Sequence, residues 1–170
     1  MSEIFVIKPA TVEDVPLILS FIKELAEYEQ LLDQVVATEA ILKETLFSGH
    51  SHAEVIIGYL NHSPVSFALF FHNFSTFLGR PGLYLEDLYV KSEMRGKGIG
   101  KQMLAYLAGL AVDRGCGRLE WWVLDWNTSA IEFYKRLGAE AMSDWTVYRV
   151  SGYALSELSQ SRGISLPLEK

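Results

Sequence analysis

Residues 83–100, which read LYLEDLYVKSEMRGKGIG, decide the fold of this chain. The first half, residues 83–90, is apolar and rich in β-formers, so it predicts a strand. The second half places glycines at alternate positions, Gly96, Gly98 and Gly100. An amphipathic helical pattern that includes Met103, Leu104, Leu107, Leu110 and Ala111 follows at once. The stretch therefore predicts a strand, a glycine-rich loop and a helix in direct succession.

The predicted loop is suited to a phosphate or pyrophosphate group. Glycines let the backbone approach a ligand closely and adopt conformations that other residues avoid. A helix N-terminus offers unpaired N–H groups and the positive end of the helix dipole. Arg95 and Lys97 add positive charge beside it.

Two other nucleotide-binding loops fit the sequence less well. A Walker loop ends in Gly-Lys-Ser or Gly-Lys-Thr, whereas Gln102 occupies the last position here. A Rossmann site follows the first strand, and an acid follows about twenty residues later. Asp125 lies about 25 residues past this loop, so spacing alone does not exclude a Rossmann site. Several predicted elements precede the loop, however, and this order argues against such a site.

The remaining pattern predicts one α/β (α+β) domain over residues 1–170, with a mixed, mostly antiparallel sheet flanked by helices. We expect helices from Thr11 and Thr38, a short helix over 129–137 that begins with a Ser129–Glu132 capping box, and a tail helix from about Tyr153. The expected strands cover residues 4–8, 53–59, 65–71, 83–90, 118–124 and 145–150.

Composition excludes some functions and leaves others open. With 15 basic and 21 acidic residues the net charge is 15 − 21 = −6, which argues against nucleic acid as a partner. The single cysteine, Cys116, permits no internal disulfide and indicates a reducing compartment, so we expect a cytoplasmic location. We find no signal peptide and no membrane-spanning run. His50 and His52 have no evident third partner, so we expect no metal.

The motifs in combination resemble the GNAT superfamily of N-acetyltransferases. More specifically, the chain is similar to the diamine (spermidine/spermine) acetyltransferases and their thialysine-preferring relatives. The resemblance spans residues 4–150 and implies the GNAT acyl-CoA N-acyltransferase fold, with a cofactor motif over 83–138. The stretches that carry it are residues 8–11, 22–29, 84–90, 95–100, 123–127 and 133–139.

The resemblance implies acetyl-CoA as co-substrate, with no metal. The backbone of Leu88 and Val90 would pair with the pantetheine arm, like one more strand added to the sheet. Asn127 would contact the same arm, although a helix cap is the alternative role for that residue. The implied cofactor-binding set is Leu88, Tyr89, Val90, Arg95, Gly96, Lys97, Gly98, Ile99, Gly100, Lys101, Asn127 and Tyr134.

Two residues match the catalytic positions of the family. Glu86 would bind the amine and help to deprotonate it through water, and Tyr134 would give a proton to the departing sulfur. A solvated residue at the edge of the sheet is the alternative role for Glu86. A core aromatic is the alternative role for Tyr134. If the strand is regular, Asp87 points away from Glu86, and we expect a structural role for it.

Tyr28, Glu29 and Glu86 match positions that bind the amine, although an exposed helix end is the alternative for the first two. Asp144 is a further candidate for binding the amine, although its stretch reads Ser-Asp-Trp where the family has Glu-Gly-Trp. A small diamine or polyamine, acetylated directly in a ternary complex, is the leading acceptor. Thialysine or another amino-acid or peptide amine is the alternative, because residues 75–80 read STFLGR and lack the Asp-Pro-Trp of the polyamine enzymes. A non-catalytic CoA-binding module is a third possibility. The resemblance also implies a homodimer.

Overall fold

The computed structural model describes residues 3–160 and divides the chain into two compact units, Met1–Trp122 and Val123–Lys170. We describe each unit by itself. The expectation of a single domain over residues 1–170 stays a prediction. In the part of the chain that the structure describes, no helix is long and apolar enough to cross a membrane.

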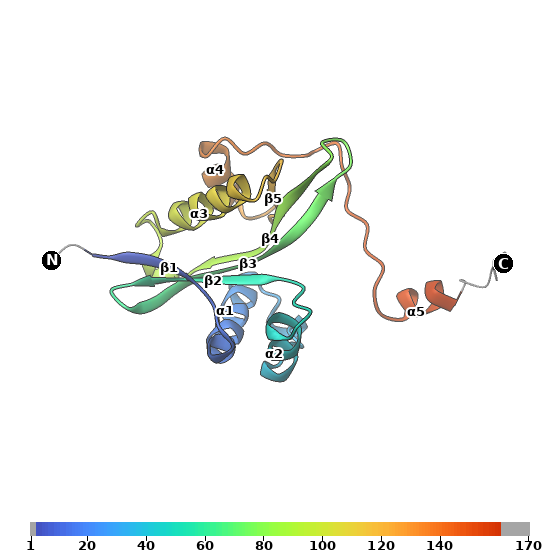
Figure 1. The fold of residues 1–170 in the computed structure, drawn as a ribbon, viewed down its shortest axis with the longest axis horizontal. Coiled ribbons are helices and arrows are strands. Elements are labelled where there is room, and N and C mark those ends of the chain that lie inside the picture. Colours follow the sequence, from blue (N-terminus) through green and yellow to red (C-terminus); the bar gives the residue numbers. More distant parts are fainter. Residues whose placement is uncertain (1–2, 161–170) are drawn as a thin grey trace. The chain divides into compact units, whose positions relative to one another are not determined.

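A five-stranded sheet in the order β1-β2-β3-β4-β5 forms the centre of the first unit (Figure 1). The first four strands are antiparallel neighbours, and β5 runs parallel to β4. The predicted mixed, mostly antiparallel sheet is therefore confirmed. The strands are β1 (Phe5–Pro9), β2 (Glu54–Leu60), β3 (Ser63–Ser75), β4 (Arg80–Val90) and β5 (Leu119–Trp121).

Helices cover both faces of this sheet (Figure 1). The helices α1 (Val15–Tyr28) and α2 (Glu39–Phe47) lie on one face, and α3 (Ile99–Asp113) lies on the other. Three single turns of 3-10 helix complete the unit, η1 (Val12–Asp14), η2 (Leu32–Gln34) and η3 (Ser92–Met94).

The core between α1 and the sheet consists of side chains that alternate along the strands. Phe21 of α1 stacks on Phe67 of β3, with ring centroids 5.3 Å apart, and both rings are fully buried. Val55 and Ile57 of β2 join the same cluster, as the period of two along a strand requires. On the other face, α3 buries the residues that the sequence pattern selected, except for Leu110, which is half-buried.

Sequence signals place the start of α2 correctly, whereas the helix expected from Thr11 begins as η1 and becomes α1 only at Val15. Thr38 caps α2 by accepting a hydrogen bond from the Ile41 amide at 3.3 Å. The carboxylate of Asp14 accepts from the Thr11 amide at 2.8 Å, which closes the turn that leads into α1. Local side-chain chemistry was therefore sufficient to place these two ends.

β5 is shorter than predicted. It pairs with β4 only from Leu83↔Leu119 to Leu85↔Trp121, whereas the sequence predicted a strand over residues 118–124. The pairing stops where β4 becomes irregular at Glu86, because an irregular strand bends away from its neighbour. Residues 86–90 consequently have no β5 residue beside them among the described pairs.

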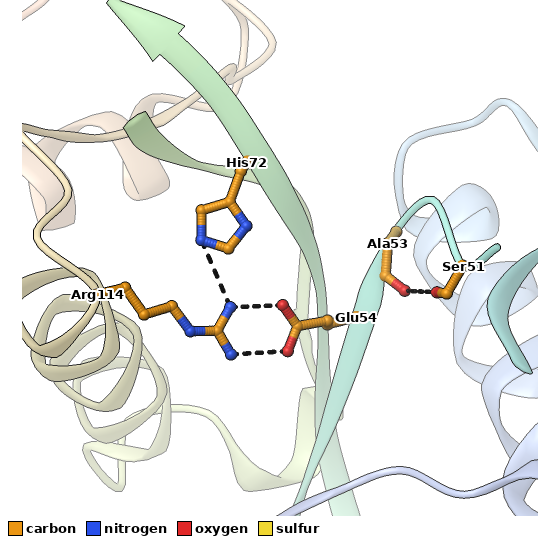
Figure 2. A network of polar contacts seen from close by, with 5 residues as sticks. All are labelled: Ser51, Ala53, Glu54, His72 and Arg114. Carbon is orange, nitrogen blue, oxygen red and sulfur yellow. Dashed lines mark hydrogen bonds and ion pairs between the residues drawn. The ribbon is translucent and has the colours of Figure 1, made fainter. Parts of the chain in front are cut away.

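An ion pair ties the end of α3 to the sheet (Figure 2). Arg114, which follows the last residue of α3, donates two hydrogen bonds to the carboxylate of Glu54, at 2.5 and 2.8 Å. Its guanidinium also lies 3.5 Å from Nε2 of His72 on β3. The hydrogen bond from Arg114 is the main cause that lowers the pKa of Glu54. This paired contact fixes the C-terminal end of the helix whose N-terminus carries the glycine loop.

The second unit contains α4 (Thr128–Arg136) and α5 (Gly152–Gln160). The predicted Ser129–Glu132 capping box is wrong, because the carbonyl oxygen of the Asn127 side chain caps α4 by accepting from the Ala130 amide at 3.3 Å. The predicted tail helix is confirmed, one residue earlier than expected.

The strand predicted over residues 145–150 does not form. Strand-forming residues become a strand only beside another backbone that takes their hydrogen bonds. In the described residues, the amide of Trp145 donates to the Met142 carbonyl in a turn, and no strand pairs with this segment. Its apolar side chains are exposed, Tyr148 by 92%.

Candidate active site

The glycine loop has the backbone geometry that its sequence predicts. Gly96 and Gly98 have φ angles of 76° and 80°, in the left-handed region that side-chain-bearing residues avoid. Gly98 is the N-cap of α3, and as a glycine it has no side chain to cap the amides of the first turn. Ile99 is buried and anchors that turn to the sheet. The bare helix start, with Gly100 and Lys101 in its first turn, therefore suits a pyrophosphate group.

The two cations of the loop have different surroundings. Lys97 is exposed, and its ammonium lies 3.7 Å from the Glu3 carboxylate. The Arg95 guanidinium instead lies over the ring of Tyr28, 4.2 Å from its centroid, and 5.7 Å from that of Tyr89. Its Nε also donates to the carbonyl of Val90 at 3.1 Å.

β4 carries a bulge at Glu86. Leu85 pairs with Phe70 and Asp87 pairs with Leu69, so one step along β3 corresponds to two steps along β4. Glu86 is the extra residue, and its side chain is exposed. The regular strand assumed for Asp87 is therefore wrong at this point. Bulges re-aim side chains and are common next to active sites.

The charges of Glu86 and Glu29 both act on Asp87 at this bulge, and we call Glu29, Glu86 and Asp87 the acidic trio. Burial, followed by the charges of Glu86 and Glu29, raises the pKa of Asp87 to about 6. Burial also raises the pKa of Glu29, which follows the last residue of α1. The trio thus joins two elements that are far apart in sequence. Sequence reasoning missed Asp87, for which the only signal was a second acid in an apolar strand.

The end of β4 has an open side. Leu88, Tyr89 and Val90 pair with β3, but β5 ends before reaching them. Tyr89 is 7% exposed and packs against Phe21 in the core. Burial is the main cause that raises its pKa. An extended guest beside residues 88–90 would meet free strand edge, as the resemblance implied for the pantetheine arm.

The other predicted site residues lie in the second unit. Asn127 caps α4, and this helix also carries Tyr134, which is half-buried and packs against Phe133 with ring centroids 5.4 Å apart. Asp144 is exposed in the segment after α4. The first unit thus brings together Tyr28, the acidic trio and the glycine loop. The roles of Asn127, Tyr134 and Asp144 beside that group stay predictions.

No group of three or more histidine, cysteine, aspartate or glutamate residues that could hold a metal ion occurs within residues 3–160. His50 and His52 are exposed in the loop before β2.

The sheet that opens beyond Leu85, together with the glycine loop, defines an α/β protein built to hold an extended ligand with an anionic group. The Acetyltransferase (GNAT) family profile matches residues 20–139, and the chain belongs to this family. The thialysine N-epsilon-acetyltransferase of Bos taurus is 39% identical over 84% of this chain and 89% of its own.

Two further proteins extend the comparison. The human spermidine/spermine N(1)-acetyltransferase-like protein 1 is 32% identical over 91% of this chain, which spans 24% of that longer protein. Among solved structures, the integron cassette protein VCH_CASS6 from V. cholerae has a TM-score of 0.77 and 32% identity, covering 92% of this chain and 98% of its own. The chain is therefore an acetyltransferase that transfers the acetyl group of acetyl-CoA to an amine, and the predicted branch is confirmed.

Proposed function

We propose that the chain acetylates a terminal amino group of a small molecule that carries two amino groups, by direct transfer within a ternary complex. The acidic trio is the observation that carries this proposal. A cationic acceptor would relieve the repulsion that Glu86 and Glu29 exert on Asp87, and each carboxylate would offer it an ion pair. Two cationic ends suit a site with more than one carboxylate.

Among such acceptors, an amino acid with a side-chain amine, as in thialysine, is favoured. The thialysine enzyme named above is similar over most of both chains. The turn between β3 and β4 also lacks the acid and tryptophan of the polyamine pattern and instead presents Phe77, which is 94% exposed. A diamine or polyamine, our leading acceptor from sequence, remains the second candidate, supported by the spermidine/spermine-like relative.

The proposed reaction assigns one role to each residue. Glu86 takes a proton from the acceptor ammonium through water, which leaves a neutral amine. The amine nitrogen attacks the thioester carbonyl carbon, and the carbon–sulfur bond breaks as the amide forms. Tyr134 gives a proton to the departing sulfur. The presence of both residues argues against a non-catalytic CoA-binding module.

The remaining residues would position the two substrates. The glycine loop and the first turn of α3 would hold the pyrophosphate, and the backbone of Leu88 and Val90 would hold the pantetheine arm. Tyr28, Glu29 and Asp144 would line the acceptor side.

A panel of amines tests the proposal. Purified protein is incubated with acetyl-CoA and one amine, and CoA release is followed with a thiol reagent. The panel holds thialysine, lysine, ornithine, putrescine and spermidine, with propylamine as the single-amine control. We expect the amines with two amino groups to have a much higher kcat/KM than propylamine. Equal kcat/KM for propylamine would contradict the role of the acidic trio.

A matched variant connects the panel to the structure. Glu29→Gln removes one charge of the trio and keeps the shape of the side chain. It should lower the preference for two amino groups and leave the kcat/KM of propylamine nearly unchanged. Glu44→Gln, an exposed carboxylate on α2, is the control and should alter neither value.

Assembly and location complete the proposal. We propose a homodimer, with the segment over residues 145–150 and α5 at the interface, and a cytoplasmic location. The exposed apolar side chains of that segment support the first. The single cysteine supports the second.

A further inference from the structure

Arg95 of the glycine loop contacts residues of two other elements. Its guanidinium contacts the rings of Tyr28, the last residue of α1, and Tyr89 of β4, at 4.2 and 5.7 Å. Its Nε donates to the Val90 carbonyl at 3.1 Å. One side chain therefore connects the loop, the end of α1 and the end of β4.

The two aromatic rings differ in how deeply they are buried. Tyr89 is 7% exposed and lies in the core beside Phe21, so it gives Arg95 a fixed support. Tyr28 is half-buried at a helix end. A cation held against both rings thus connects Tyr28 at the helix end to Tyr89 in the sheet.

Tyr28 leads directly to the acidic trio. Its neighbour Glu29 is close enough to Asp87 for its charge to raise the pKa of that carboxyl. A shift at the end of α1 would therefore change the spacing of the carboxylates. Arg95 therefore connects the loop proposed to bind the cofactor with the residues proposed to bind the acceptor.

We propose that Arg95 is a positioning residue that couples the glycine loop to the end of α1 through Tyr28. Ordering of the loop by acetyl-CoA fixes Arg95, which fixes Tyr28 and Glu29 in the arrangement that the acceptor requires. Because such coupling is reciprocal, the end of α1 also affects the affinity for acetyl-CoA. This inference rests on the proposed function for the nature of the two ligands.

Arginine is suited to this role and lysine is not. The guanidinium is planar, so it stacks on a ring while its Nε–H donates in its own plane to a carbonyl. An ammonium is a compact charge that cannot make both contacts in this geometry. Arg95→Lys therefore keeps the charge of the loop and removes the connection.

Calorimetry of acetyl-CoA binding without any amine tests the coupling. Arg95→Lys and Tyr28→Leu should each weaken acetyl-CoA binding by about three- to tenfold, although Tyr28 is outside the loop. The double variant should bind acetyl-CoA no more weakly than whichever single variant has the lower affinity, because both changes remove the same contact. Tyr28→Phe retains the ring and should retain the affinity.

A second aromatic–cation pair provides the matched control. Lys8 lies 5.6 Å over the ring of Tyr59, far along the sequence from the loop. Tyr59→Leu should leave acetyl-CoA affinity unchanged. Thermal melts of every variant establish that the proteins compared are folded, and Arg95→Lys, an exposed position, keeps the test usable if Tyr28→Leu does not fold.

The effect of Arg95 on acceptor binding is measured with the acceptor that the amine panel selects. Arg95→Lys should raise the acceptor KM at saturating acetyl-CoA, with a smaller change in kcat. Wild-type affinity for acetyl-CoA in Tyr28→Leu, or additive losses in the double variant, would overturn the coupling. Failure of the wild-type protein to bind acetyl-CoA would instead overturn the proposed function.

Discussion

Tyr134 is the residue on which the proposed chemical step depends. Expulsion of CoA as a thiolate places charge on sulfur, and a proton from a phenol lowers that cost. General acid assistance typically contributes ~10²–10⁴-fold in rate. Tyr134→Phe keeps the ring beside Phe133 and removes only the hydroxyl, so kcat should fall strongly while acetyl-CoA affinity and thermal stability change little. Steady-state kinetics and calorimetry measure the two effects.

Glu86→Gln is the natural comparison for that variant. It should lower kcat/KM for the amine, because Glu86 is assigned to the acceptor. Full kcat in Tyr134→Phe, with chemistry shown to be rate-limiting, would return Tyr134 to the role of a packing aromatic. Water or another group would then protonate the sulfur.

The raised pKa of Asp87 predicts how the stability of the fold depends on pH. Its folded pKa of about 6 lies above the ordinary value of 3.8, so the folded protein binds this proton more tightly than the unfolded chain. The contribution of this carboxyl to the free energy of unfolding is therefore fully present below pH 4 and is lost as the pH rises through 6. The loss amounts to up to about 3 kcal/mol. Asp87→Asn should melt at a higher temperature than wild type above pH 6, and the difference should close toward pH 4.

Thermal melts between pH 4 and pH 8 measure this difference. Glu44→Gln, on the exposed side of α2, serves as the control and should follow the wild-type curve. If Asp87→Asn and wild type melted in parallel at all pH values, the burial of this carboxylate would not have the energetic effect assigned to it.

At the scale of the element, the junction of loop and helix gives a test with a close control. Gly98 has a φ of 80°, and a side chain there would also stand where the proposed pyrophosphate approaches. Gly98→Val should abolish acetyl-CoA binding and cost about 1–2 kcal/mol of stability. Gly79 has a φ of 61° in the turn between β3 and β4 with open space around it, so Gly79→Val carries similar strain.

The two glycine variants separate backbone strain from ligand contact. Both should melt slightly earlier than wild type, but only Gly98→Val should lose acetyl-CoA binding by calorimetry. Normal affinity in folded Gly98→Val would remove the loop from the cofactor site.

At the scale of the whole molecule, assembly is the property that we predict. Light scattering at micromolar concentration should give about twice the mass of the 170-residue chain. The physical reason is the apolar segment over residues 145–150, which includes Trp145, 71% exposed, and Tyr148. Replacing both by serine should shift the protein toward the monomer, whereas a wild-type protein that is monomeric throughout would contradict the prediction.

The sequence by itself determined the features that depend on neighbouring residues. Alternate glycines before a helical pattern specified a helix start open to an anion, because backbone freedom at Gly96 and Gly98 is a local property. Thr38 likewise placed the start of α2. The motifs of residues 4–150 were distinctive enough to identify the family, which the profile match over residues 20–139 confirmed.

Only the tertiary structure decided the features that need a partner distant in sequence. The bulge at Glu86 exists because β3 and β4 pair out of step, and no local pattern marks it. Asp87 has a raised pKa because other elements bury it and bring Glu29 close. The predicted strand over residues 145–150 failed for the same reason, since β-propensity requires a neighbouring strand that the described chain does not supply. Arg95 reads in the sequence as a loop cation, and only the fold brings it onto the ring of Tyr28.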